Sequence, residues 1–126
     1  MACRGIRGAI TVGRNNREEI LSATRMLLEA IVEKNNIMPA NLEHDMVSVI
    51  FTATTDLDAV YPAVAARELG WTQVPLLCMQ ELHVKGSLRM CIRVLLQWNT
   101  EREQSDMRHI YLGGARSLRP DLVEEA

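Results

Sequence analysis

The sequence predicts one α+β domain over residues 1–126, in which a mixed β-sheet carries two helices on one of its faces. Three observations support this fold class. The 126-residue chain is long enough for one hydrophobic core and short for two. Hydrophobic residues make up 48% of it, as a packed core requires. Segments that resemble strands and helices follow one another in the order β-α-β-α-β-β-β, without repeats or low-complexity segments.

The first strand is predicted over residues 3–12, where side chains alternate between the two faces of the sheet. Apolar side chains take one face, whereas Arg7 lies on the other face among small side chains. A helix follows, because Asn15-Asn16 offers an N-cap and apolar residues then recur at helical spacing. Asn35-Asn36 ends this helix.

The middle of the chain is predicted to hold a central strand and a second helix. Residues 46–52 are rich in β-branched side chains and form the strand. The helix carries Pro62 in its first turn and ends at Gly70. A turn near Gly86 separates two of the later strands. These later strands are expected over residues 74–79, 89–98 and 107–112.

The end of the chain and the uncovered side of the sheet indicate two further features. Gly113-Gly114 is a predicted hinge, so we expect residues 113–126 to form a mobile C-terminal lid. Two helices can cover only one face of the sheet. The strands are apolar enough that the other face is also expected to be buried, which a neighbouring subunit would achieve. We therefore predict a homo-oligomer.

Charge and cysteine usage exclude several kinds of partner. A net charge of −2 and a pI of about 5.9 leave no basic excess for a phosphate backbone, so nucleic acid is not an expected partner. The arginines gather near both ends of the chain, which suits a small anion. The 3 cysteines lack CxxC spacing, so we expect reduced thiols in a cytoplasmic protein. Neither a signal peptide nor a run of eighteen apolar residues appears, so no membrane partner is expected.

Arg93 lies in a strongly apolar stretch, where its charge needs a partner. A guanidinium cannot lose its proton and is costly to bury unpaired. Either Glu81 pairs with it, or an anion from outside the chain does. A structural ion pair is the simpler explanation of one arginine, but Arg7 is a second guanidinium in a strand and requires a second anion. Strict alternation places Cys78 and Glu81 on opposite faces, so both line one site only if the chain bulges between them or two subunits contribute.

The reactive groups comprise arginines, a glutamate, a tyrosine and a thiol, without an obvious general base. Tyr111 is equally well explained as a half-buried core residue, and Cys78 as a small core hydrophobe. The histidines lack ligand spacing and no phosphate-binding loop occurs, so neither a metal nor a cofactor is expected. Such a set binds and polarises an anion better than it moves protons. It fits a binding protein, and it also fits an enzyme whose reaction needs only shape and charge.

Five ordered blocks within residues 3–122 resemble the monofunctional chorismate mutases of the trimeric α/β-barrel class. The blocks are RGIRGA at 4–9, TDLDAVYPAVAAREL at 55–69, VPLLCMQE at 74–81, CIRV at 91–94, and HIYL with LRPDL within 109–122. The resemblance implies a homotrimer whose sheets pack into a pseudo-α/β-barrel, with active sites in the clefts between subunits. It also implies the Claisen rearrangement of the substrate chorismate to prephenate, in phenylalanine and tyrosine biosynthesis, without cofactor or metal.

The resemblance further implies which residues form the site. Arg93 would face the ether oxygen of the breaking bond, Arg7 would bind a carboxylate, and Glu81 would accept a hydrogen bond from the ring hydroxyl. These three would be the catalytic residues. The full set of substrate contacts would be Arg7, Tyr61, Arg67, Cys78, Glu81, Arg93, Tyr111, Leu118 and Arg119.

Departures from the family pattern concern the rim of the expected site. Val64 stands where some relatives have a lysine and Leu77 where some have a threonine, so substrate capture is affected more than chemistry. Tyr61 replaces a phenylalanine with little change of shape. Two other functions fit the same residues: an imine/enamine deaminase of the small trimeric type, whose rate would vary with pH, and a dicarboxylate sensor that binds without turnover.

Overall fold

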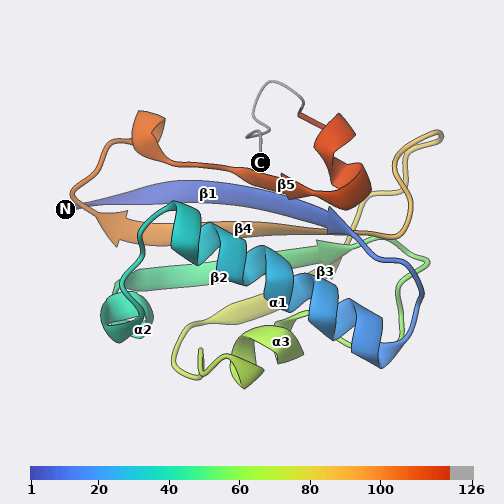
Figure 1. The fold of residues 1–126 in the computed structure, drawn as a ribbon, viewed down its shortest axis with the longest axis horizontal. Helices are drawn as coiled ribbons and strands as arrows, with labels where there is room; N and C mark the ends of the chain where they lie inside the picture. The colour runs from blue at the N-terminus through green and yellow to red at the C-terminus, as the bar shows by residue number, and fades with distance from the viewer. Residues whose placement is uncertain (120–126) are drawn as a thin grey trace.

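The computed structural model describes residues 1–119 and shows a five-stranded mixed sheet (Figure 1). The strand order across the sheet is β3-β2-β4-β1-β5. β4 runs antiparallel to β1 and β2, whereas β5 is parallel to β1 and β3 is parallel to β2. The predicted mixed sheet and the order of its elements are therefore confirmed. The strands are β1 Ala2–Thr11, β2 Met46–Ala53, β3 Leu76–Gln80, β4 Cys91–Thr100 and β5 Ile110–Leu112.

The long helix α1 spans Arg17–Lys34 and begins where the sequence predicts. The side chain of Asn16 caps it by accepting a hydrogen bond from the backbone N–H of Glu19 at 2.9 Å. Asn35 is the C-cap, as expected. Although α1 is the longest helix, no helix of the described residues has the length and apolar character needed to cross a membrane.

Two shorter helices complete the layer. α3 spans Ala63–Glu68, directly after Pro62, and the chain leaves it through Gly70, whose φ of 95° favours glycine. This confirms the predicted second helix. A further four-residue helix, α2 at Leu42–Asp45, was not predicted, because one turn is too short to give a periodic pattern. Figure 1 shows α1 and α3 in front of the same face of the sheet, as predicted.

Several predicted strand boundaries were wrong by a few residues. β4 begins at Cys91 rather than at residue 89, because Met90 has a φ of 50° and its N–H donates to the Asp56 carboxylate at 3.0 Å in a turn. β3 begins after Pro75, which has no N–H for the ladder. β5 is shorter than expected and begins only at Ile110.

The main core lies between the sheet and the helices. Phe51, Ile6 and Ile31 are fully buried in it. The backbone of β1 approaches α1 closely at Gly8, where an added Cβ would lie 2.8 Å from Cδ1 of Ile31. The opposite face, here called the uncovered face, carries Arg7 and Arg93 together with apolar side chains that remain exposed, such as Leu77 at 56%.

The C-terminal part of the described chain covers one corner of the uncovered face. Gly113 and Gly114 begin a short 3-10 helix, η3 at Gly113–Ser117, and the hinge expected at these glycines stays a prediction. The Gly114 N–H donates to Oγ1 of Thr11 at 2.8 Å, which ties this turn to the end of β1. A second, smaller cluster of buried residues lies beneath it and comprises Ala9, Cys91, Tyr111 and Ala115. The rest of the predicted lid, residues 120–126, lies outside the described residues.

Candidate functional site

One row of side chains crosses the uncovered face of the sheet. Strand register places the members of this row opposite one another, and residues opposite each other in a ladder share a face. Arg93 lies in the middle of the row, between the small side chains of Ala9 and Thr52, which leaves space beside its guanidinium. From β5 to β3 the row is Tyr111, Ala9, Arg93, Thr52 and Met79.

A cavity of about 440 Å³ lies over this row, and we call it the sheet-face cavity. Its walls also include apolar parts of β2 and β4, so it combines a few charged groups with an apolar lining, as small-molecule sites do. Six of the nine predicted site residues meet here within one chain. They are Arg7, Glu81, Arg93, Tyr111, Leu118 and Arg119.

Glu81 and Arg93 form an ion pair in the wall of the sheet-face cavity. Nε of Arg93 lies 3.3 Å from Oε2 of Glu81, but this buried nitrogen makes no hydrogen bond to any described residue. The Thr52 hydroxyl donates to the same Oε2, and the Glu81 N–H donates to the carbonyl of Ala53 at 2.9 Å. The Thr52 hydroxyl therefore holds the carboxylate, the Ala53 carbonyl holds the backbone that carries it, and the charge of the carboxylate attracts the guanidinium.

The structure thus confirms one of the two explanations of Arg93, the ion pair with Glu81. The pair does not lie inside the core, however. The Arg93 side chain is 40% exposed and lines the cavity together with Arg7. Binding of an external anion beside this pair stays a prediction, and the position of a second guanidinium in the same cavity supports it.

Arg7 of β1 and Tyr111 of β5 line the sheet-face cavity at the end of the row opposite to β3. Arg7 is exposed and projects from β1 on the face of Ala9, so the expected setting among small side chains is confirmed. Tyr111 is more buried than the half-buried residue expected, at 8% exposure, because it packs with Ala9 and Leu118. The phenol is thereby held at the edge of the cavity.

The three remaining predicted residues lie on the helix-covered side of β3. Tyr61 and Cys78 line a different cavity of about 640 Å³, here called the helix-side cavity, and Arg67 of α3 is not among the lining residues of either cavity. Burial raises the pKa of the Cys78 thiol, and the nearby Arg67 guanidinium partly offsets this. The prediction that Cys78 and Glu81 lie on opposite faces is confirmed.

The two rim positions that depart from the family pattern lie on different sides of the sheet. Val64 lines the helix-side cavity. Leu77 is exposed on the uncovered face, opposite Ile50 of β2. Neither residue lines the sheet-face cavity, so both are placed to affect entry or assembly rather than the groups around Arg93.

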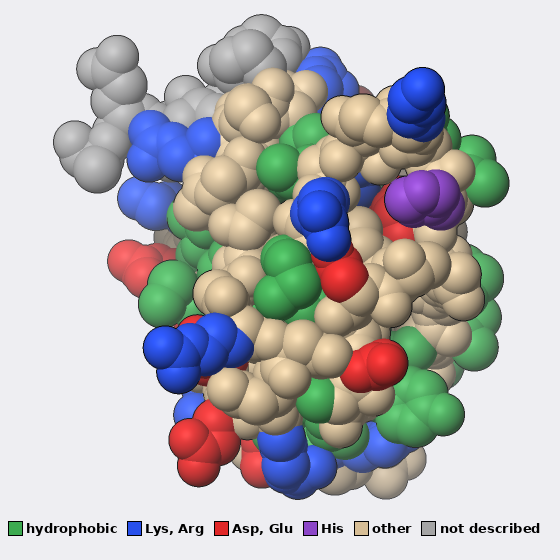
Figure 2. All heavy atoms as spheres, turned by 90° about the vertical axis from the view of Figure 1, so that its right-hand side faces the viewer, with side chains coloured by type: hydrophobic (Ala, Val, Ile, Leu, Met, Phe, Trp, Pro, Cys, Tyr) green, Lys and Arg blue, Asp and Glu red, His purple; other side chains and the backbone are tan. Residues whose placement is uncertain are grey.

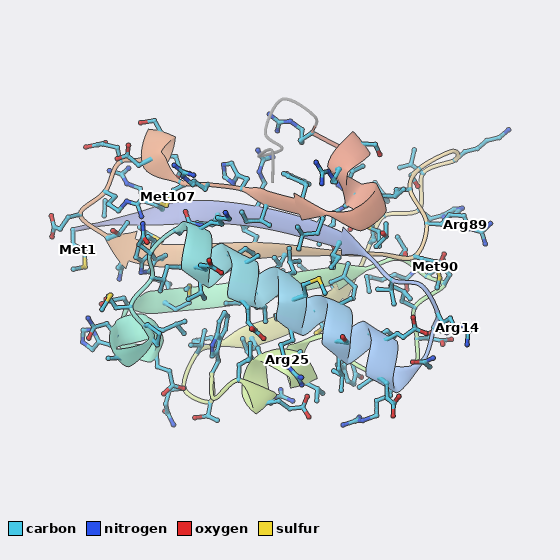
Figure 3. The ribbon with its side chains drawn as sticks, viewed as in Figure 1. Met1, Arg14, Arg25, Arg89, Met90 and Met107 are labelled. Carbon is cyan, nitrogen blue, oxygen red and sulfur yellow. The ribbon has the colours of Figure 1, made fainter. Side chains whose placement is uncertain are left out.

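Charged side chains of both signs surround the end of the sheet at which β4 begins (Figure 2). Arg14, Arg89 and Met90 lie at this end, and Met1 and Met107 at the opposite one (Figure 3).

Asp56 is the carboxylate that holds the turn before β4. Although burial works to raise the pKa of Asp56, hydrogen bonds from Thr54 and Met90 and the charge of Arg89 lower it overall. This carboxylate fixes the turn that leads into β4 and thus the position of Arg93. Within residues 1–119, no group of three or more His, Cys, Asp or Glu side chains is placed to hold a metal ion.

Two residues near the site were missed by sequence reasoning. Thr52 could have been found, because alternation within MVSVIFT places it on the face opposite to Phe51. His109 could not, because its role depends on a contact with Arg7: Nδ1 accepts the Arg7 backbone N–H at 2.9 Å across 102 positions of the chain. Histidine spacing along the sequence carries no signal for such a contact.

Comparisons with known proteins agree on one family. The sequence profile described as chorismate mutase type I matches residues 3–122. The chain is 50% identical to chorismate mutase AroH of Bacillus subtilis over 123 residues, which cover 97% of this chain and 94% of that protein. It is also 50% identical to chorismate mutase AroH of Thermus thermophilus over 119 residues, or 94% and 95% of the two chains. A solved chorismate mutase from Clostridium thermocellum matches with a TM-score of 0.85 and 48% identity, covering 90% of this chain and 97% of the other.

Proposed function

The chain belongs to the chorismate mutase type I family, and we infer that it is an isomerase that rearranges chorismate to prephenate, a step toward phenylalanine and tyrosine. Chorismate is a dianion, and its Claisen rearrangement is concerted and intramolecular. No proton has to be transferred, so a site without a general base suffices. The observation that carries this conclusion is the joint lining of the sheet-face cavity by Arg7, Arg93, Glu81 and Tyr111.

Each of these groups has a role in the proposed mechanism. As the C–O bond breaks, negative charge grows on the ether oxygen, where Arg93 stabilises it. Arg7 binds a carboxylate, and Tyr111 holds the carboxylate of the side chain. Glu81 accepts a hydrogen bond from the ring hydroxyl and opposes the positive charge that develops on the ring. Because Glu81, itself held by the Thr52 hydroxyl, already pairs with Arg93 before substrate arrives, little reorganisation is needed during the reaction.

The magnitudes are sufficient for catalysis by charge and orientation alone. A millionfold acceleration requires about 8 kcal/mol, the low end for enzymes. One well-placed donor to a developing oxyanion supplies roughly 3–4 kcal/mol. Holding the flexible side chain of chorismate in its reactive conformer supplies much of the rest, since orientation can contribute about 7 kcal/mol or more. No cofactor or metal is required for this reaction.

We further propose that the site is completed between subunits of a homotrimer. Tyr61, Arg67 and Cys78 lie on the side of β3 opposite to the sheet-face cavity, so they reach its substrate only from a neighbouring chain. Exposed apolar side chains on and after β3 also need cover. Packing of the uncovered faces in a pseudo-α/β-barrel would bury them. These exposed residues are Leu77, Met79, Leu82 and Val84.

The remaining parts of the proposal concern the C-terminal segment and the setting of the protein. Leu118 and Arg119 line the sheet-face cavity from the end of the described chain, which supports a lid formed by residues 113–126. The whole chain acts as one domain in this proposal. The cytoplasm is its expected location, since all three cysteines are free thiols.

The decisive test of the activity is the decay of chorismate absorbance with purified protein. We expect a kcat that is nearly flat between about pH 6 and 9 and shows no solvent isotope effect on the chemical step, because no proton moves. A bell-shaped profile would favour the deaminase. Saturable binding of chorismate without turnover would favour the sensor.

Complementation between two inactive variants tests the site between subunits. Arg93→Ala removes a group of the sheet-face cavity, and Arg67→Ala removes one from the other side of β3. In trimers mixed from equal amounts, about a quarter of the interfaces would combine two intact halves and recover activity. Mixing the wild-type chain with the double variant Arg67→Ala/Arg93→Ala gives the matched control. No recovery in the first mixture would place each complete site within one chain.

A further inference from the structure

The edge of β1 that faces β5 is completed by side chains as well as by backbone. β5 is short, and its ladder with β1 begins only at the pair of Gly8 and Ile110. Before that point, the Gln104 side chain accepts the Gly5 N–H at 2.8 Å and donates to the Gly5 carbonyl at 2.7 Å. The imidazole of His109 accepts the next inward N–H, that of Arg7, at 2.9 Å. Two side chains therefore replace the missing strand backbone.

The His109 contact requires one particular form of the ring. An N–H group donates, so Nδ1 must carry a lone pair and the proton of the neutral imidazole must sit on Nε2. A protonated imidazole has N–H groups at both positions and cannot accept. The Gln104 contact has no such dependence, because an amide does not titrate in the physiological range. Of these two side-chain contacts to β1, only the one between His109 and the Arg7 N–H therefore depends on pH.

The surroundings of the ring favour this neutral form. Burial lowers the pKa of His109, and the charges of Arg7 on β1 and Arg119 after η3 lower it further. The end of α1, which also packs against β5, presents there the uncharged Asn35, whose side chain holds both the N–H and the carbonyl of Arg108. Among the described residues, the charges that shift the pKa of this ring are those of Arg7 and Arg119, both cations.

We propose that neutral His109 is a positioning residue for the catalytic site, which holds the backbone of Arg7 through Nδ1 and releases it on protonation. Because the folded protein favours the neutral ring, this support is fully present above the ordinary histidine pKa of about 6.5 and is lost as pH falls through the lower folded value. The substrate-binding arginine then loses its backbone anchor. The effect therefore falls on the acid side of about pH 6.5 and is expected in KM, whereas the flat profile is expected in kcat.

Protonation has a second consequence of opposite sign, which makes the proposal easy to test. A third positive charge beside Arg7 and Arg119 attracts a dianion and would by itself lower KM as the pH falls. Release of the Arg7 backbone raises KM. His109 is only partly buried, so solvent screens its charge, and we expect the loss of position to dominate.

The first experiment is an NMR titration of the free protein between pH 8 and 4.5, which follows the His109 ring and the Arg7 amide. We expect both to titrate together in the wild-type protein. In His109→Asn, the Asn carbonyl keeps an acceptor in place of Nδ1 without a titrating group, so the Arg7 amide should no longer move over this range. An Arg7 amide that is insensitive to the titration of His109 would overturn the proposal.

The second experiment measures KM and kcat for chorismate over the same pH range, and this part rests on the proposed function. We expect KM of the wild-type protein to rise about three- to tenfold on acidification, the size of losing one hydrogen bond, while His109→Asn shows a smaller rise. His109→Leu should have the raised KM already at pH 8. Gln104→Ala, which removes the neighbouring side-chain support, should leave the pH profile of KM unchanged.

The outcomes separate this inference from the function itself. A KM that falls on acidification, or an identical rise in the wild-type protein and His109→Asn, would refute the role of His109. A protein that does not convert chorismate, yet whose Arg7 amide titrates with His109, would refute the proposed function and leave the positioning role supported.

Discussion

The two faces of the sheet differ in what they contain and in what they do. The helix-covered face buries apolar side chains such as Phe51 and Ile92, both at 0% exposure. The uncovered face carries Arg7, Arg93 and the exposed Leu77, which do little for the stability of a single chain. In the proposed function, the packed apolar side chains of one face stabilise the fold, whereas Arg7, Arg93 and Glu81 on or near the other face act on the substrate. A substitution should affect stability or catalysis according to the face on which its side chain lies.

The largest expected effect of a single substitution is on the helix-covered face. Phe51→Ala should lower the free energy of unfolding by about 3–5 kcal/mol, because it leaves a cavity in a fully packed core. Urea denaturation measures this change. Val47→Ala, on the same strand but exposed, should stay within about 0.5 kcal/mol and serves as the control. Similar losses for both variants would contradict the contrast between the faces.

The next effect is on catalysis and belongs to the uncovered face. Arg93→Ala should lower kcat on the order of 10²-fold or more, because it removes the charge that is proposed to stabilise the ether oxygen, while the proposed trimer persists. Steady-state kinetics and native mass measurement test both parts. Arg25→Ala removes an exposed arginine that pairs with Glu68 at 3.3 Å on the helix side, and its activity should be unchanged. Full activity of Arg93→Ala would remove this residue from the mechanism.

A smaller loss is expected when the support of Glu81 is removed. Thr52→Val keeps the shape of the side chain but not the hydroxyl that donates to Oε2 of Glu81, so kcat should fall about tenfold. Ser48→Ala provides the control, since its hydroxyl lies on the same strand but bonds to Gln97 instead. If both variants lowered kcat alike, the effect would come from β2 in general and not from the carboxylate.

The smallest effect is expected at the thiol that reaches the proposed site from the helix-covered side. Cys78→Ser should change kcat and KM by no more than a few-fold, because a hydroxyl of similar size takes the place of a thiol that packs or donates only weakly. Burial also raises the pKa of the Cys91 thiol, to about 11, and keeps that thiol protonated near neutral pH. A total loss of activity in Cys78→Ser would show that the thiol has a chemical role in the reaction.

Local patterns in the sequence determined the elements and their faces. Alternation within a strand placed Arg7 among small side chains, and it separated Cys78 from Glu81, because successive side chains point to opposite faces whatever lies around them. The cap at Asn16 followed in the same way, since it involves a hydrogen bond only three residues along the chain. The family resemblance supplied the set of site residues, which alternation alone did not.

Only the tertiary structure decided which of these groups meet. The ion pair of Arg93 with Glu81, the hydroxyl of Thr52 on the same oxygen, and the ring of His109 on the Arg7 amide all join residues far apart in sequence. Each contact depends on the order and register of five strands, and a shift of one residue would turn the side chains to the other face. For that reason the sequence could indicate a need for a partner at Arg93, but the fold had to select the partner.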